Sequence, residues 1–183
     1  MRWERLWSDL EQQAEALDRD ELAAEVHDRT VIEQSSVQLM DRVRASLGLR
    51  LRCDVAGGGR WQGVLLGVGS NWFALARSDT SDASDAHGHA PVILPSVAVT
   101  AVAGLAPRAV MLDALGPVAR RSTLAMALRR LVEAGERVQV HRSQASPLSG
   151  RLTVCGQDYV ELCDDDAVTW SVPTAALGAV TMA

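Results

Sequence analysis

Lysine is missing from this 183-residue sequence, and all 18 of its basic side chains are arginines. Uniform use of arginine, together with abundant Ala, Val and Leu, is typical of a GC-rich genome and does not by itself indicate arginine recognition chemistry. Long apolar runs are also missing, and because no stretch of 18 apolar residues occurs, we expect no membrane-spanning helix. The first seven residues include acidic charge and contain no apolar core, which argues against a secretory signal.

An overall excess of positive charge is lacking as well. The formal net charge is −5, and it resides in residues 1–48, which hold 6 arginines against 11 acidic residues, whereas residues 49–183 hold 12 of each. Nucleic-acid binders usually carry a basic excess, because phosphate neutralisation supplies most of their affinity. This balance disfavours that class, although 107–151 is a local exception with 8 arginines against 3 acidic residues.

One pattern is written twice, 87 positions apart. Its clearest members recur in order: Gly48, Gly63 and Gly69 return as Gly135, Gly150 and Gly156, and Trp72 and Leu75 return as Tyr159 and Leu162. The segment 94–98 returns as 172–176, now 78 positions on, so the first copy carries nine extra residues before it. A repeat of this length predicts two domains of one fold.

Cysteine is scarce in both copies. Cys53, Cys155 and Cys163 are odd in number and occupy non-equivalent positions of the repeat. A disulfide framework shared by the copies is therefore excluded, and we expect a protein of the reducing cytoplasm.

Hydrophobic periodicity predicts the elements of each copy. Apolar residues three or four apart indicate a helical extension over 1–35, and each copy then begins with a short helix that ends at Gly48 or Gly135. Strands are expected near 49–55, 61–77 (two strands meeting at 69–71), 92–94 and 97–102, and again near 137–142, 149–155, 158–163, 167–172 and 175–181. The predicted fold class is α+β, with an N-terminal helical segment followed by two tandem small SH3-like β-barrels, each a helix plus five strands. The expected domains are 1–35, 36–106 and 107–183.

Two resemblances agree with this plan. The motif Gly63-x-Leu65-x-x-Val68-Gly69-x-Asn71-Trp72-x-x-Leu75 and its second copy over 150–162 resemble the first motif of Sm-like proteins. The segments 94–102 and 172–180 stand in place of the second Sm motif without its Arg-Gly or Lys-His signature, which argues against the RNA contacts of Sm-like RNA binders. The whole chain is similar to a family of actinobacterial proteins that open with Trp-Glu-x-Leu-Trp and close with two barrels. Some members are labelled Fis-type transcriptional regulators, although this sequence contains no helix-turn-helix pair.

A histidine pair is the most metal-like feature. His87 and His89 lie among Asp79, Asp82 and Asp85 in the stretch 78–90. The Ser, Asp and Ala content of this stretch favours a solvated loop over a zinc site. The cysteines lie among apolar neighbours, and no nucleophile or phosphate-binding motif occurs. We therefore expect no enzyme activity, no cofactor and no metal.

The predicted function is a protein-interaction or scaffold module. Trp3, Leu6, Trp7 and Leu10 form an apolar stripe that is costly to leave in water, so we expect it, or the barrel edges, to bind a protein partner or a second copy. The alternative is a regulator that binds RNA or DNA through the arginine-rich segment 120–151. Its candidate residues are Asn71, Arg120, Arg121, Arg129, Arg130 and Asp158.

Overall fold

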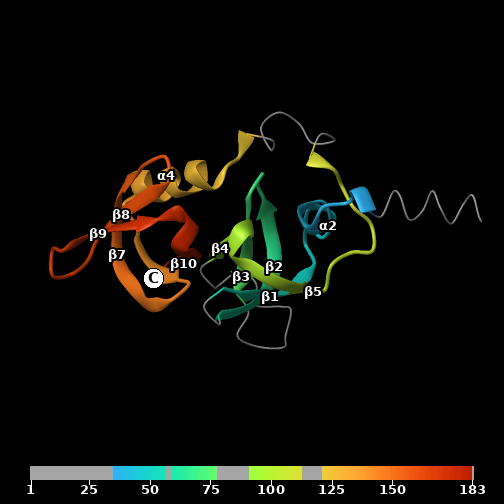
Figure 1. Ribbon diagram of the computed structural model, residues 1–183, viewed down its shortest axis with the longest axis horizontal. Helices are drawn as coiled ribbons and strands as arrows, with labels where there is room; N and C mark the ends of the chain where they lie inside the picture. Colours follow the sequence, from blue (N-terminus) through green and yellow to red (C-terminus); the bar gives the residue numbers. More distant parts are fainter. Residues whose placement is uncertain (1–34, 57–58, 78–90, 113–120, 183) are drawn as a thin grey trace, which may run out of the picture. The chain divides into compact units, whose positions relative to one another are not determined.

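The structure is a computed structural model that describes residues 35–56, 59–77, 91–112 and 121–182 (Figure 1). The described residues from Leu39 onward form one compact unit. The predicted helical extension lies outside the described residues except for its last position. Below, residues 39–112 are called the first half and residues 121–182 the second half.

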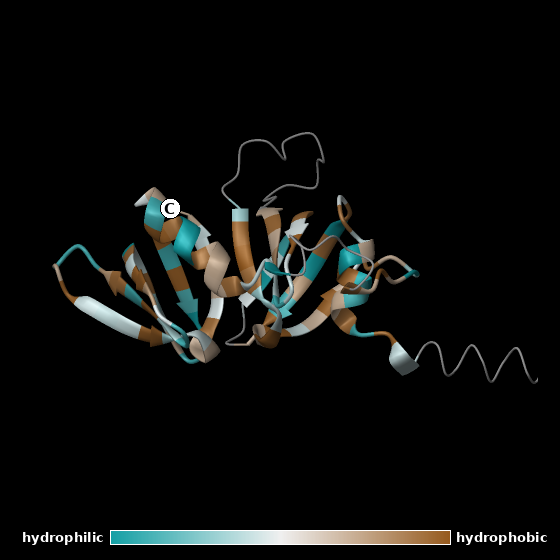
Figure 2. Ribbon diagram, turned by 90° about the horizontal axis from the view of Figure 1, so that it is seen from above, coloured by the Kyte–Doolittle hydropathy of each residue, from teal (hydrophilic) through white to brown (hydrophobic). Residues whose placement is uncertain are grey.

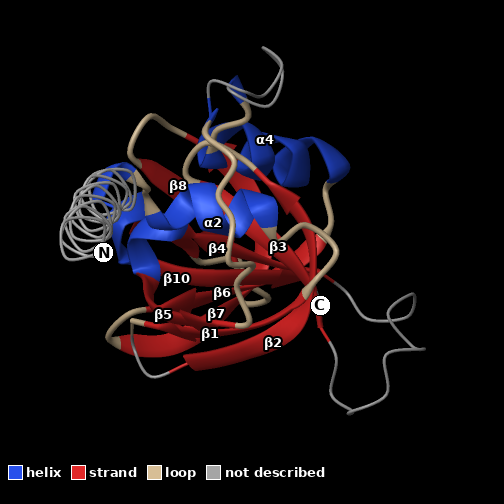
Figure 3. Cartoon of the chain, turned by 90° about the vertical axis from the view of Figure 1, so that its right-hand side faces the viewer, coloured by secondary structure: helices blue, strands red, loops and turns tan. Residues whose placement is uncertain are grey.

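The described unit is mostly strand, with two α-helices (Figure 3). The elements of the first half are α2 (Leu39–Ala45), β1 (Arg50–Val55), β2 (Gly59–Val68), β3 (Trp72–Arg77), β4 (Pro91–Pro95), the 3-10 turn η2 (Ser96–Ala98) and β5 (Val99–Ala103). Those of the second half are α4 (Leu124–Ala134), β6 (Arg137–Arg142), β7 (Ala145–Cys155), β8 (Tyr159–Cys163), β9 (Thr169–Pro173), the 3-10 turn η4 (Thr174–Ala176) and β10 (Leu177–Met182).

Helix α4 has defined signals at both ends. The hydroxyl of Thr123 accepts a hydrogen bond from the backbone N–H of Met126 at 3.3 Å. Gly135 ends the helix in the left-handed region at φ 64°, as the sequence predicted. The leucines between these ends recur at three and four residues and are buried against the second half. Neither helix in the described part of the chain is long and apolar enough to cross a membrane.

The strands join into one open sheet, and the prediction of two separate closed barrels is wrong. All ten strands follow the order β5-β1-β2-β3-β4-β10-β6-β7-β8-β9, so β4 of the first half pairs with β10 of the second (Figure 1). Closing either half would require its own two outer strands to pair with each other. The apolar pattern of a strand records that it is buried, but it does not record which strand lies beside it.

The two copies of the repeat, 87 positions apart, also have the same strand-pairing register. The order β5-β1-β2-β3-β4 of the first half recurs as β10-β6-β7-β8-β9. Equivalent pairs face each other in both halves: Cys53–Val102 matches Val140–Val180, Leu65–Leu75 matches Leu152–Leu162, and Ala74–Ile93 matches Glu161–Ser171. The irregularity in β2 between Leu65 and Gly67 also recurs in β7 between Leu152 and Val154. The two halves therefore share one backbone pattern.

Gly63 and its repeat equivalent Gly150 are both required by close packing of neighbouring strands. A side chain at Gly63 would overlap the carbonyl oxygen of Ala76 on the neighbouring strand, and one at Gly150 would overlap that of Cys163. Only glycine allows the backbones to approach this closely.

The core consists of two apolar clusters that share the sheet. Apolar residues recur along the strands of both halves (Figure 2). One cluster belongs mainly to the second half but includes Ile93 of β4, and the other belongs mainly to the first half but includes Ala179 of β10. Each half therefore completes its core with a residue from the other, which ties the halves together through the β4–β10 pair.

Candidate functional site

The two outer strands are the open part of the fold. Among the described strands, β5 pairs only with β1, and β9 pairs only with β8. An outer strand presents unpaired backbone N–H and C=O groups, and many proteins block such a strand with charge. Neither β5 nor β9 contains a charged residue. These two strands are the candidate interaction site.

Strand β9 carries a large exposed side chain. Trp170 is 41% exposed, its neighbour Ser171 is exposed, and Val172 reaches the core. The indole Nε1 of Trp170 donates a hydrogen bond to the Asp164 carboxylate at 2.7 Å. The ring is thus fixed in place while part of its surface faces solvent.

The turn before β9 is held by the same carboxylate. Asp164 also accepts hydrogen bonds from the backbone N–H groups of Val168 at 2.9 Å and Asp166 at 3.0 Å. The indole of Trp170, and then the N–H of Val168, lower the pKa of Asp164 from its usual range. Ala167 adopts a left-handed φ of 60° within this turn. The turn therefore has a defined conformation that sets the position of Trp170.

Strand β5 offers a surface of small side chains. Thr100, Ala101 and Ala103 are exposed, whereas Val102 is partly buried. The Thr100 hydroxyl donates a hydrogen bond to the backbone carbonyl of Asp54 at 3.1 Å, which fixes β5 onto β1. Nothing bulky on this strand obstructs the approach of another strand.

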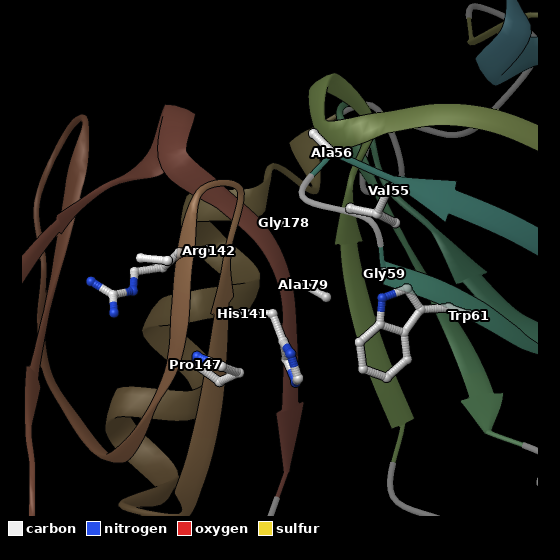
Figure 4. Close-up of a pocket in the computed structure, with 10 residues that line it drawn as sticks. Val55, Ala56, Gly59, Trp61, His141, Arg142, Pro147, Gly178 and Ala179 are labelled. Carbon is white, nitrogen blue, oxygen red and sulfur yellow. The ribbon is translucent and has the colours of Figure 1, made fainter.

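A cleft of about 130 Å³ lies beside the β4–β10 pair (Figure 4). Trp61 of β2 and His141 of β6 meet at its wall edge to face, with ring centroids 4.9 Å apart. Arg142 points away from them in Figure 4 and donates hydrogen bonds to the carbonyl of Ser146. The ring contact joins the two halves, so we assign this cleft a structural role.

Asn71, a residue of the nucleic-acid alternative, takes part in folding. Its side-chain oxygen accepts a hydrogen bond from the backbone N–H of Leu124 at 2.8 Å, so it holds the start of α4. Its repeat partner Asp158 is exposed and uses its backbone carbonyl, which accepts hydrogen bonds from Thr174. The backbone carbonyl of Asn71 likewise accepts a hydrogen bond from the N–H of Ser96, so the two turn residues share this backbone role, and the side chain of Asn71 adds the contact with α4.

Three of the four arginines proposed to bind nucleic acid lie in the described part of the chain. Arg121 is exposed, and Arg129 and Arg130 are adjacent and exposed on α4. Arg130 also lines a shallow hollow of about 390 Å³ with Trp72 and Met126. The other predicted site residues lie outside the described residues, and so do the two histidines that were weighed as metal ligands: Trp3, Leu6, Trp7, Leu10, Arg120, His87 and His89.

The thiols are free but are not arranged for catalysis. Burial raises the pKa of Cys53 to about 11. Burial also raises the pKa of Cys155, against the opposing charge of Arg129. Within the described ranges, His, Cys, Asp and Glu residues form no group of three that could hold a metal ion.

No family model matches the chain, and no curated protein matches it significantly. The resemblances drawn from its motifs therefore stay predictions, and the geometry of the sheet carries the functional argument.

Sequence reasoning named barrel edges only in general and did not predict that β5 and β9 are the two outer strands of one sheet. A usable signal lies in the contrast between equivalent strands. The fourth strand of the first half contains Val92 and Ile93, and that of the second half has Trp170 and Ser171 at these positions. A run that is apolar on both faces indicates an inner strand, whereas a mixed run indicates an outer one.

Proposed function

We propose that this chain is a non-enzymatic, cytoplasmic protein-interaction module that binds partners at the open edges of its sheet. The observation that carries the proposal is that the sheet ends in two uncharged strands, β5 and β9, each with one paired side among the described strands. The free thiols support a reducing compartment.

Strand addition is the mode of binding that suits such edges. An extended segment of a partner pairs its backbone with the outer strand, and side-chain contacts beside the strand supply specificity. On β9 that contact is Trp170, since a partly exposed and rigidly held indole is a frequent anchor of protein interfaces. A hollow of about 260 Å³ next to it, lined by Trp170, Pro173 and Gln144, offers room for a partner side chain.

The stripe of Trp3, Leu6, Trp7 and Leu10 stays a predicted second docking element. It lies outside the described residues, so it is tested separately from the edges. A Trp3→Ala/Trp7→Ala double variant removes the stripe without altering β5 or β9.

Photo-crosslinking in the native host tests the proposal directly. We expect p-benzoylphenylalanine in place of Trp170 on β9, or of Thr100 on β5, to give covalent protein adducts. The control is the same residue in place of Glu133, which is exposed and belongs to α4 and to neither edge strand. Adducts no stronger at 170 and 100 than at 133 would refute edge binding.

A nucleic-acid-binding regulator remains the second candidate, favoured by the adjacent exposed side chains of Arg129 and Arg130. It requires binding that weakens steeply as salt rises. An Arg129→Ala/Arg130→Ala variant then loses affinity for RNA or DNA relative to the unchanged chain. Titrations at low salt that detect no binding exclude it.

A further inference from the structure

The hollow of about 390 Å³ at the start of the second half is a surface that edge binding does not use. Three elements and the residue just before α4 contribute its lining. The residues are Trp72 of β3, Ile93 of β4, Ser122, and Met126, Ala127 and Arg130 of α4. None of them belongs to β5 or β9, so a partner bound here is a further partner site and not a detail of the edges.

The apolar part of the hollow is formed in advance. The indole Nε1 of Trp72 donates a hydrogen bond to the carbonyl of Ser122 at 3.1 Å, which fixes the ring beside the chain that leads into α4. Ile93 is a buried core residue, whereas Met126 is 46% exposed. The unbranched thioether of methionine adapts its shape to different partners. One rigid aromatic wall and one adaptable wall together suit a single apolar side chain of a partner.

Arg130 adds one positive charge to this apolar lining. It lies four residues after Met126 and is exposed, so the two side chains share a face of α4. Within the described residues, no hydrogen bond or ion pair occupies its guanidinium. The described residues 121–134 contain three arginines against the single acidic residue Glu133. A carboxylate that reaches the hollow therefore meets a positive surface and a guanidinium able to bind it in a two-pronged manner.

We propose that this hollow binds an acidic segment of a protein partner. An apolar side chain of the segment enters beside Trp72 and Met126, and a neighbouring Asp or Glu pairs with Arg130. The lining favours this chemistry over a nucleic acid, because a phosphate backbone gains its affinity from several cations, and only one lining side chain is charged.

NMR of the full-length chain, observed at methionine methyl groups and tryptophan indoles, tests the proposal. The probes are pools of short peptides in which a Leu or Phe stands between Asp and Glu residues. One reference pool replaces the acids by Asn and Gln, and the other replaces the apolar residue by Ser. We expect the acidic apolar pool to shift the Met126 methyl and Trp72 indole signals, and both reference pools to shift them less.

A charge variant separates specific pairing from general attraction. We expect Arg130→Gln to raise the apparent Kd for the acidic apolar pool by about tenfold, because it removes the charged partner of the carboxylate. Arg108→Gln is the matched control, since Arg108 is an exposed arginine outside α4, and it leaves the Kd unchanged. Equal weakening by the two variants overturns the proposal.

Three other results also overturn it. The first is that no pool shifts the Met126 and Trp72 signals. The second is that a single-stranded oligouridine shifts them and the peptides do not, which assigns the hollow to nucleic acid. The third is that a change in protein concentration alone shifts them, which assigns it to a second copy of the chain. Crosslinking at positions 100 and 170 reports on β5 and β9 separately, so edge binding stands or fails independently of these results.

Discussion

Trp170 and Cys53 differ in how much of each side chain reaches solvent: Trp170 is 41% exposed, and Cys53 is fully buried. Trp170 is held by Asp164 and left partly in solvent, where it is able to contact a partner. Cys53 has no exposed surface, and its neutral thiol acts as a small apolar group in the first-half core. The site is therefore built from an aromatic side chain and backbone groups, and not from a reactive thiol.

The raised pKa of Cys53 predicts a thiol that does not react in the folded state. At pH 8 we expect a thiol-specific reagent to modify Cys163 before unfolding and Cys53 only as the chain unfolds, because the nucleophile is the thiolate. Since the folded-state pKa is raised from 9.0 to about 11, the stability that this thiol contributes is complete below pH 9.0 and declines as pH rises toward 11. Rapid labelling of Cys53 in the folded chain would contradict its burial.

At the scale of elements, the start of α4 depends on the first half. The backbone N–H of Ser70 and the indole of Trp72 both donate to the carbonyl of Ser122, and Asn71 accepts from Leu124. The β2–β3 turn therefore holds the helix of the second half. Within the described ranges, the equivalent β7–β8 turn makes no such contact with the start of a helix, and Asp158 there is exposed.

Replacement of Asn71 tests this asymmetry. We expect Asn71→Ala to lower the free energy of unfolding by about 1 kcal/mol, the usual cost of losing a side chain that satisfies a helix N-terminus. Asp158→Ala, at the equivalent position, is the matched control and changes stability little. Urea denaturation followed by circular dichroism measures both variants, and equal losses would contradict the assigned role.

Much of the element order was readable from the sequence. Gly135 ends a helix, and Leu51 and Cys53 alternate with Arg52 as a half-buried strand must. Strand pairing between the halves was not readable, because Ile93 and Ala179 show only that their strands are buried. The helix-holding role of Asn71 was equally hidden, since it depends on a residue 53 positions away.

At the scale of the whole molecule, the repeat is built by adding strands to one sheet. Because β4 and β10 pair with each other, both are inner strands of the sheet. Each apolar core includes one buried residue from the other half, next to this pair. The two edges that remain, β5 and β9, are uncharged.

Hydrogen exchange, read by mass spectrometry on peptides that cover β4, β10, β5 and β9, tests the central claim most directly. Inner strands have both backbone sides paired, whereas outer strands have one. The account predicts strong protection of β4 and β10, which are paired on both sides, with β5 and β9 exchanging faster. Exchange of β4 and β10 as fast as that of the outer strands would contradict a single continuous sheet.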